Sequence, residues 1–172
     1  MVSMVRLGFG AALFALAVLS VSSIADAAEE KRFDDWMLRC AERAPPDAPR
    51  CIITQDIVSN ETNLGIVSAA IYYRPGKNTP TLGFNLAPQA IKQKGMSLQI
   101  DDKPSMDMQI QGCNDKFCGV RVNFPDNVMK QFRTGKIGVV AFSVPPEKRI
   151  GAKISLKGFS AAMKALEQRR DR

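Results

Sequence analysis

The four cysteines are the residues whose type and spacing bear most directly on chemistry. Cys40 and Cys51 would close a ring of 12 residues, and Cys113 and Cys118 one of six. Four sulfurs can form a metal cage, a redox pair or structural disulfides. A zinc site needs C-x2-C pairs or histidine ligands, and a thioredoxin-like site needs C-x-x-C; the chain has none of these. The spacing favours two local disulfides, although four cysteines allow three pairings.

Catalysis by familiar routes is limited because the chain contains no histidine. That absence removes Ser-His-Asp and Cys-His nucleophiles, histidine-ligated zinc and the usual general base near neutral pH. Two carboxylate pairs, Asp34 with Asp35 and Asp101 with Asp102, remain as candidates for hydrolysis of a glycan. Adjacent strand residues point to opposite faces, and Asp101-Asp102 is typical of a hairpin turn. We therefore expect no catalytic residue, no cofactor and no bound metal.

The positive charge is concentrated in the last third of the chain. Residues 28–119 hold 11 basic and 12 acidic side chains, whereas residues 120–172 hold 12 basic and 4 acidic ones. Five of the basic residues form a candidate basic surface: Lys148, Arg149, Lys153, Lys157 and Lys164. Such a surface favours an acidic protein or an anionic envelope component as the partner, rather than nucleic acid. The alternative is a solvated surface that only keeps the protein soluble.

The first 27 residues have the form of a secretory signal peptide. Arg6 precedes the apolar run LGFGAALFALAVLSV, and Ala25-Asp26-Ala27 matches the small-x-small site that signal peptidase cuts. We predict cleavage after Ala27; the alternative is an uncleaved anchor, because the run approaches the ~20 residues that a membrane span needs. No second segment of membrane length follows. Export would place the protein in the periplasm or at the outer membrane, where disulfides persist.

The mature chain, 28–172, has the length of one domain and shows no repeat or flexible linker. Short, partly alternating segments rich in β-branched residues predict strands, and turn formers such as Arg74-Pro75-Gly76 separate several of them. The expected strands are 51–59, 64–74, 96–101, 106–113, 118–124, 136–144 and 149–157. This pattern is typical of a mainly β protein, an antiparallel sandwich or barrel.

Two segments show helical periodicity instead. A short internal helix is expected after Pro125, with Val128 and Phe132 on its apolar face and Gly135 ending it. A C-terminal helix is expected from Phe159, and its apolar stripe suits packing on an end or face of the sheets. The stripe consists of Phe159, Ala162, Met163 and Leu166.

Four short motifs follow one another along the mature chain. They are Phe33-Asp34-Asp35-Trp36 before Cys40, Gln55 shortly after Cys51, Gly112-Cys113, and SLKGFSAAMKAL at 155–166. Together they resemble the invasion-associated locus B family of exported bacterial proteins, and the resemblance covers essentially the whole mature chain. Asp34 departs from the pattern, because the family often has glycine there. That departure puts the local turn before Trp36 in question.

The resemblance implies an immunoglobulin-like β-sandwich of the periplasm or outer membrane, in a family named for host-cell invasion. It brings no catalytic residues. Trp36 and Phe33 are expected to anchor the core, and Gly158 and Phe159 to mark a tight turn and a plug at the start of the last helix. We expect a non-enzymatic, disulfide-stabilised envelope protein that binds a partner through a sheet edge or its basic surface. A carboxylate-based hydrolase acting on an envelope polymer is the alternative.

Overall fold

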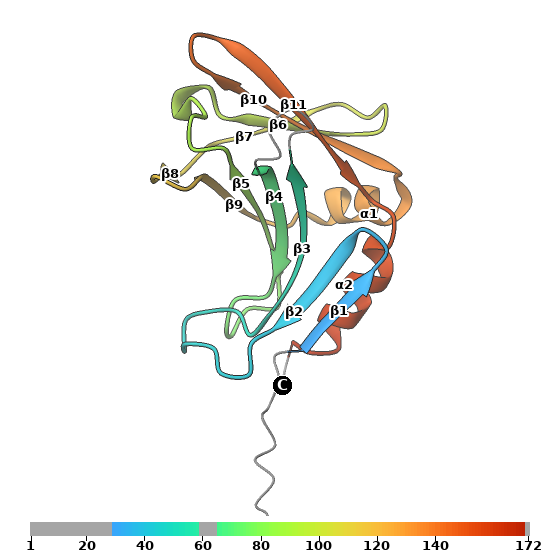
Figure 1. Cartoon of the computed structure of the whole chain (residues 1–172). Coiled ribbons are helices and arrows are strands. Elements are labelled where there is room, and N and C mark those ends of the chain that lie inside the picture. The colour runs from blue at the N-terminus through green and yellow to red at the C-terminus, as the bar shows by residue number, and fades with distance from the viewer. Residues whose placement is uncertain (1–28, 59–64, 171–172) are drawn as a thin grey trace, which may run out of the picture.

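The computed structural model describes residues 29–58 and 65–170, so the predicted signal peptide at 1–27 lies outside the described residues. Within them the chain forms two antiparallel sheets and two α-helices (Figure 1). This confirms the mainly β, antiparallel two-sheet architecture with an internal and a C-terminal helix. The immunoglobulin-like arrangement of the strands and the single domain over 28–172 stay predictions.

The larger sheet has seven strands and the smaller sheet four. In spatial order the larger sheet consists of β1 (Glu29–Phe33), β2 (Trp36–Cys40), β3 (Cys51–Val58), β4 (Gly65–Tyr72), β5 (Thr81–Leu86), β9 (Cys118–Asn123) and β8 (Gly112–Cys113). The smaller one consists of β11 (Lys148–Ser155), β10 (Ile137–Val144), β6 (Met96–Ile100) and β7 (Met106–Met108). A 3-10 turn, η1 (Lys92–Lys94), precedes β6. The outermost strands are therefore β1 and β8 in one sheet and β11 and β7 in the other.

The segment predicted as one strand at 106–113 is instead two strands in different sheets. β7 pairs with β6, and β8 pairs with β9, so the chain crosses between the sheets at 109–111. Gln111 fixes the crossing: its Oε1 accepts from the Arg121 N–H at 2.8 Å, and its Nε2 donates to the Arg121 carbonyl at 3.1 Å. The alternation of the sequence continues through this crossing and does not reveal it.

Three strands, β1, β2 and β5, were not expected from the sequence pattern. In β2 the side chains of Trp36, Leu38 and Cys40 are buried, whereas Arg39 between them is exposed. Such alternation places one face of the strand on the core. In β5 every residue except Asn85 is buried, which is the position of a central strand covered on both faces.

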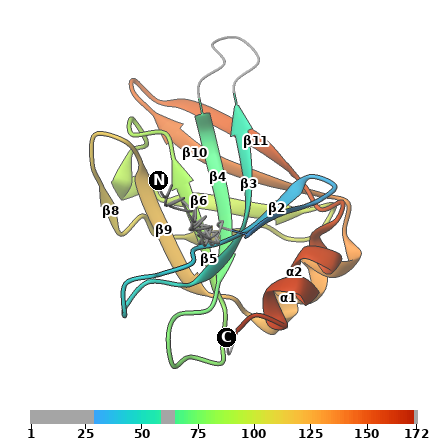
Figure 2. The ribbon, with the colours of Figure 1, turned by 60° about the horizontal axis from the view of Figure 1, so that its bottom comes forward.

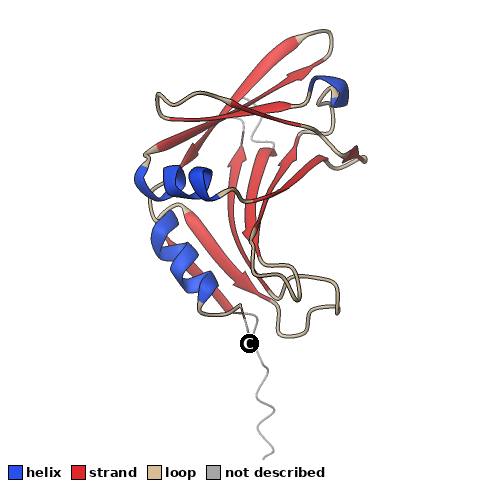
Figure 3. Ribbon diagram, turned by 180° about the vertical axis from the view of Figure 1, so that it is seen from behind, coloured by secondary structure: helices blue, strands red, loops and turns tan. Residues whose placement is uncertain are grey.

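The two helices pack together on one side of the sheets (Figures 2 and 3). They are α1 (Asp126–Thr134) and α2 (Phe159–Glu167), and both agree with the prediction. Edge-to-face aromatic contacts join them: Phe159 lies 5.2 Å from Trp36 of β2 and 5.1 Å from Phe132 of α1, between ring centroids. Phe124, just after β9, lies 5.2 Å from Phe132. Trp36 and Phe159 are therefore core residues, as expected.

The last strand enters α2 through a tight turn at Gly158. Its φ is +83°, a left-handed conformation that glycine adopts without strain. A Cβ at this position would also collide with the Phe33 carbonyl oxygen, so the turn leaves no room for a side chain. The β1–β2 turn and the start of α2 are thus packed backbone against backbone, which confirms the predicted turn.

Both disulfides have the local pairing that the spacing favours. Cys40 is bonded to Cys51, and Cys113 to Cys118, so no cysteine of the described residues is free. Each bond joins residues directly opposite one another on adjacent strands. These sulfurs are therefore structural and do not form a metal cage.

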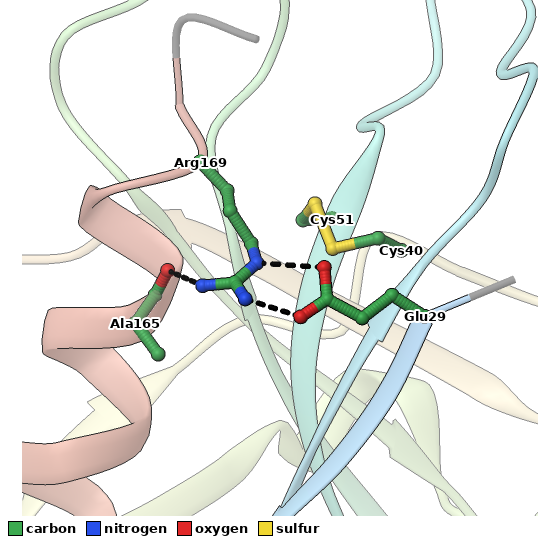
Figure 4. Close-up of a disulfide and its surroundings, with 5 residues drawn as sticks. All are labelled: Glu29, Cys40, Cys51, Ala165 and Arg169. Carbon is green, nitrogen blue, oxygen red and sulfur yellow. Dashed lines mark hydrogen bonds and ion pairs between the residues drawn. A yellow bond between two sulfur atoms is a disulfide. The ribbon is translucent and has the colours of Figure 1, made fainter.

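Next to the first disulfide, the C-terminal end of the molecule is tied to its first described strand. Arg169, just after α2, donates from Nε and Nη2 to the two carboxylate oxygens of Glu29 (Figure 4). Its Nη1 donates to the Ala165 carbonyl at 3.0 Å. The hydrogen bonds to Glu29 raise the pKa of Arg169 above its ordinary value. This pair holds α2 along β1.

Candidate functional site

The outer edge of β11 is the longest sheet edge among the described residues. β11 has eight residues and forms the end of its sheet, with β10 on its only paired side. The Leu156 N–H donates to the Lys136 carbonyl, back toward β10, whereas the peptide groups of Ser155 face away from β10. Because the direction alternates along a strand, the N–H and C=O groups of Arg149, Gly151 and Lys153 also face outward.

Gln55 of β3 occupies this edge at one position. Its Oε1 accepts from the Ser155 N–H at 2.8 Å, and its Nε2 donates to the Ser155 carbonyl at 2.9 Å. The side-chain amide thus pairs with Ser155 as a neighbouring strand would. Gln55 Nε2 also donates to the Asp35 carbonyl, and Trp36 Nε1 donates to the Ser155 carbonyl at 3.0 Å. Gln55 is only 8% exposed, so it is a buried link between the two sheets.

A polar cavity of about 490 Å³ lies where this edge meets the larger sheet. Its walls come from β1, β2, β3 and β11. Its charged lining consists of the cations Arg32, Arg39 and Lys153 and the carboxylates Asp35 and Asp56. Val58, which is 48% exposed, and Ile57 add an apolar section to the same wall. The cavity can therefore accept charged groups and at least one aliphatic group together.

The three cations of the cavity differ in the ion pairs and hydrogen bonds that they form. Arg39 is paired with Glu30 at 3.0 Å and also donates to Thr54 Oγ1 at 3.0 Å. Among the described residues, Arg32 donates to the Asp34 carbonyl alone. Neither Arg32 nor Lys153 forms an ion pair with any residue in 29–58 or 65–170. Within the described residues, no ion pair therefore neutralises these two positive charges.

The structure divides the five residues of the candidate basic surface. Lys148, Arg149 and Lys153 belong to β11, all exposed, and Arg149 donates to Ser97 Oγ of β6 at 2.8 Å. Lys157 follows the strand and is paired with Asp34 at 3.2 Å. Lys164 lies on α2, which packs against β1, β2 and β3. The five residues thus lie on β11, on the turn after it and on α2, and of the five only Lys153 lines the cavity.

Both predicted carboxylate pairs contain a residue with a structural role. Asp34 pairs with Lys157, and Asp101 accepts from the backbone N–H groups of Lys136 and Ile137 through its side-chain oxygens. Asp101 lies in a turn after β6, as its sequence predicts. The carboxylates that do share a cavity are Asp35 and Asp56. Neither predicted pair forms a two-carboxyl cleft of the kind a glycosidase uses.

Several residues of the site were not identified from the sequence. Arg32 and Arg39 lie more than a hundred positions before Lys153, and the packing of β11 against the larger sheet brings them to one cavity. Gln55 belonged to a family motif but carried no predicted role. A glutamine within the predicted strand 51–59 was its only sequence signal, since a buried amide needs partners.

No helix in the described part of the chain combines the length and the apolar character that a membrane span requires.

Comparison with known proteins shows which family has this architecture. The family model described as "Invasion associated locus B (IalB) protein" matches residues 36–167. The chain belongs to this family. The IalB match includes both disulfides, Gln55 and all of β11, whereas Arg32 and Asp35 of the cavity lie before the matched residues. The resemblance noted in the sequence is thereby confirmed.

Among relatives, the chain is similar to the invasion protein B homologs of Brucella abortus strain 2308 and of Brucella abortus biovar 1 strain 9-941. It is 26% identical to each over 140 residues, which cover 80% of this chain and 79% of the relative. The crystal structure of invasion associated protein b from Bartonella henselae superposes with a TM-score of 0.71 at 19% identity. It covers 84% of this chain and 100% of that one, so the IalB fold is shared.

Proposed function

We propose that this IalB-family chain is a non-enzymatic, exported envelope protein that binds an acidic protein partner at β11 and the adjoining cavity. One observation carries the proposal: an exposed edge strand bears Lys148, Arg149 and Lys153 and no acidic residue. It lies beside a cavity that also contains Arg32, a cation without an ion pair among the described residues. Clustered charge of one sign raises the association rate with an oppositely charged partner and orients it.

Family membership supports the proposed location of the protein in the cell envelope. The relatives are named as invasion proteins, and two structural disulfides suit an oxidising compartment. We place the protein in the periplasm or at the outer membrane, delivered by the signal peptide predicted at 1–27. A role in host-cell invasion or in envelope integrity belongs to the same proposal.

A protein partner suits this site better than an anionic lipid surface. The cavity contains carboxylates as well as cations, namely Asp35 and Asp56. A flat anionic membrane would bring these carboxylates close to like charge, which costs free energy. A folded or extended protein can instead place acidic groups on Lys153 and Arg32 and leave Asp35 and Asp56 hydrated.

Charge reversal in intact cells tests the proposal. The double variant R149E/K153E should lose a partner that crosslinks to the wild-type protein, with about a tenfold or larger fall in yield, because close charge pairs are worth a few kcal/mol. K164E changes a lysine on α2 and should keep the partner.

The outcome distinguishes the candidate partners. Equal loss with K164E would indicate a nonspecific charge effect and would contradict the proposal. Adhesion of the wild-type protein to anionic vesicles, abolished in R149E/K153E without any change in protein crosslinking, would replace the protein partner with a membrane surface.

A further inference from the structure

The outer edge of β11 presents a short row of backbone N–H and C=O groups that have no hydrogen-bond partner among the described residues. The N–H and C=O groups of Arg149, Gly151 and Lys153 have no partner within residues 29–58 and 65–170. From Arg149 to Lys153 the row extends over about 14 Å at the rise of an antiparallel strand. Such a row is the template on which a further strand can pair.

We infer that β11 receives an extended acidic segment of the partner protein, which adds to the smaller sheet as a fifth strand beyond β11. The inference rests on the proposed function, since it takes the acidic partner from there and assigns how that partner binds. Main-chain hydrogen bonds supply affinity in strand addition, and alternate side chains supply specificity.

Gln55 sets the end of the added strand. Its amide already occupies both peptide groups of Ser155, so a partner segment pairs along Arg149, Gly151 and Lys153 and stops before Ser155. The β8 end of the larger sheet and the β7 edge of the smaller sheet offer less. Gln111 blocks β9 at Arg121 in the same way, and the edge strands β7 and β8 have only three and two residues.

The side chains of β11 indicate what the segment contains. Arg149 and Lys153 lie on the same face of the strand, with Gly151 between them. Opposite charges on neighbouring strands attract, so acidic residues at alternate positions of the segment would face them. Val58 and Ile57, which line the cavity beside Lys153, offer a contact for an aliphatic residue. The predicted segment therefore alternates acidic and aliphatic residues.

A second copy of this chain is a poorer occupant of the edge. In an antiparallel pair of β11 strands centred on Gly151, Arg149 of each copy would face Lys153 of the other. Like charges directly opposite one another destabilise strand pairing. Self-association through this edge is therefore disfavoured, and an acidic partner is favoured.

The test changes the backbone of β11 without changing its charge. In G151P the outward N–H is lost, while the hydrogen bonds to β10 remain, because proline is tolerated where an edge N–H faces solvent. A Cβ at position 151 meets only Val139 Cγ1, at 4.0 Å, so there is room for it. G151A is the matched control, since it adds a Cβ and keeps the N–H.

The probe is a fluorescent ten-residue peptide that alternates glutamate and valine, with a lysine–valine peptide as its charge control. The wild-type protein and G151A should bind the acidic peptide equally, and G151P should bind it at least about tenfold more weakly, the loss expected for one intermolecular hydrogen bond and its neighbours. In the wild-type protein, the amides of Arg149, Gly151 and Lys153 should gain protection from hydrogen exchange when the peptide is added. This second measurement holds even if G151P fails to fold.

Four results would overturn the inference. The first two are no binding of the acidic peptide to the wild-type protein at about 1 mM and equal binding of the peptide by G151P. The other two are no new amide protection in the wild-type protein and a wild-type dimer that the G151P substitution dissociates. Equal binding by G151P together with weak binding by R149E/K153E would remove strand addition and leave the proposed function intact. Equal binding by both variants would remove both.

Discussion

Asp34 shows how a residue other than glycine occupies a left-handed backbone position. Its φ is +50°, in the turn before Trp36. Aspartate enters this region more readily than most residues, because its short side chain bonds locally. Here its carboxylate pairs with Lys157 at 3.2 Å.

Two substitutions of Asp34 separate the backbone from the ion pair. Both D34A and D34G remove the pair with Lys157, but only D34A keeps a Cβ at a positive φ. We expect D34G to be more stable than D34A by about 1 kcal/mol, as measured by urea unfolding. Equal free energies of unfolding would show that the conformation carries no cost.

Gln55 is the residue on which the link between the sheets most depends. In Q55L the Ser155 N–H would lose its partner at a nearly buried position. We expect a loss of about 2–3 kcal/mol in the free energy of unfolding, because an unsatisfied buried group adds its desolvation cost to the lost hydrogen bonds.

Q99A is the control for this change. Gln99 is an exposed glutamine of β6, and its truncation should alter stability by less than about 0.5 kcal/mol. A similar effect of the two variants would mean that Gln55 contributes only as a surface residue does.

Among the elements, the turn into α2 depends on close backbone packing rather than on conformation alone. Gly158 and Gly76 both have positive φ, but a Cβ at Gly76 meets nothing within 4 Å, whereas one at Gly158 collides with Phe33. G76A should therefore cost about 1 kcal/mol, and G158A about 3 kcal/mol or more. Thermal unfolding of the two variants checks the difference, and equal shifts would contradict it.

The elements also show what a single sequence can and cannot reveal. Strands with alternating β-branched residues, such as β10, and both helices with their apolar stripes were predicted close to their observed positions. β1 was missed because EEKRF is almost wholly charged and exposed, and β5 because Pro80, Gly83 and Asn85 resemble a turn. In β5, Gly83 instead lies beneath the side chain of Arg121, so close that a Cβ at this position would come within 2.9 Å of Arg121 Cδ.

The candidate site could be predicted only in part for a related reason. Lys153 was found from the charge of its own segment, which is local information. Arg32 joins it through a cross-sheet contact that no local pattern encodes. Lys164 was grouped with Lys153 because the two are close in sequence, although a turn and a change of element separate them.

At the scale of the whole molecule, stability in alkaline solution should report on the packing of Tyr73. Burial raises the pKa of this phenol above its ordinary value of 10.0, and the nearby Glu167 raises it further, against smaller opposite effects of Arg170 and Arg133. The neutral phenol is thus favoured in the folded state. Its contribution to stability is complete below pH 10.0 and is lost as the pH rises through the folded-state pKa.

Y73F isolates this contribution, because phenylalanine keeps the ring and does not titrate. The difference in unfolding free energy between wild type and Y73F should stay constant below about pH 9 and then shift against the wild type at higher pH. Lysines titrate in both proteins and cancel in the comparison. Parallel curves across the alkaline range would contradict the assignment.

The Cys40–Cys51 bond has a consequence for the loop at 41–50, which lies at the far end of the larger sheet from β11 (Figure 1). Because the bond closes this loop at its base, where the Ala41 N–H also donates to the Arg50 carbonyl, a protease cut after Arg43 would leave both fragments covalently joined. A nicked molecule would migrate as one band without reductant and as two with it. The loop is therefore a suitable place to insert an epitope tag or to open the chain for circular permutation.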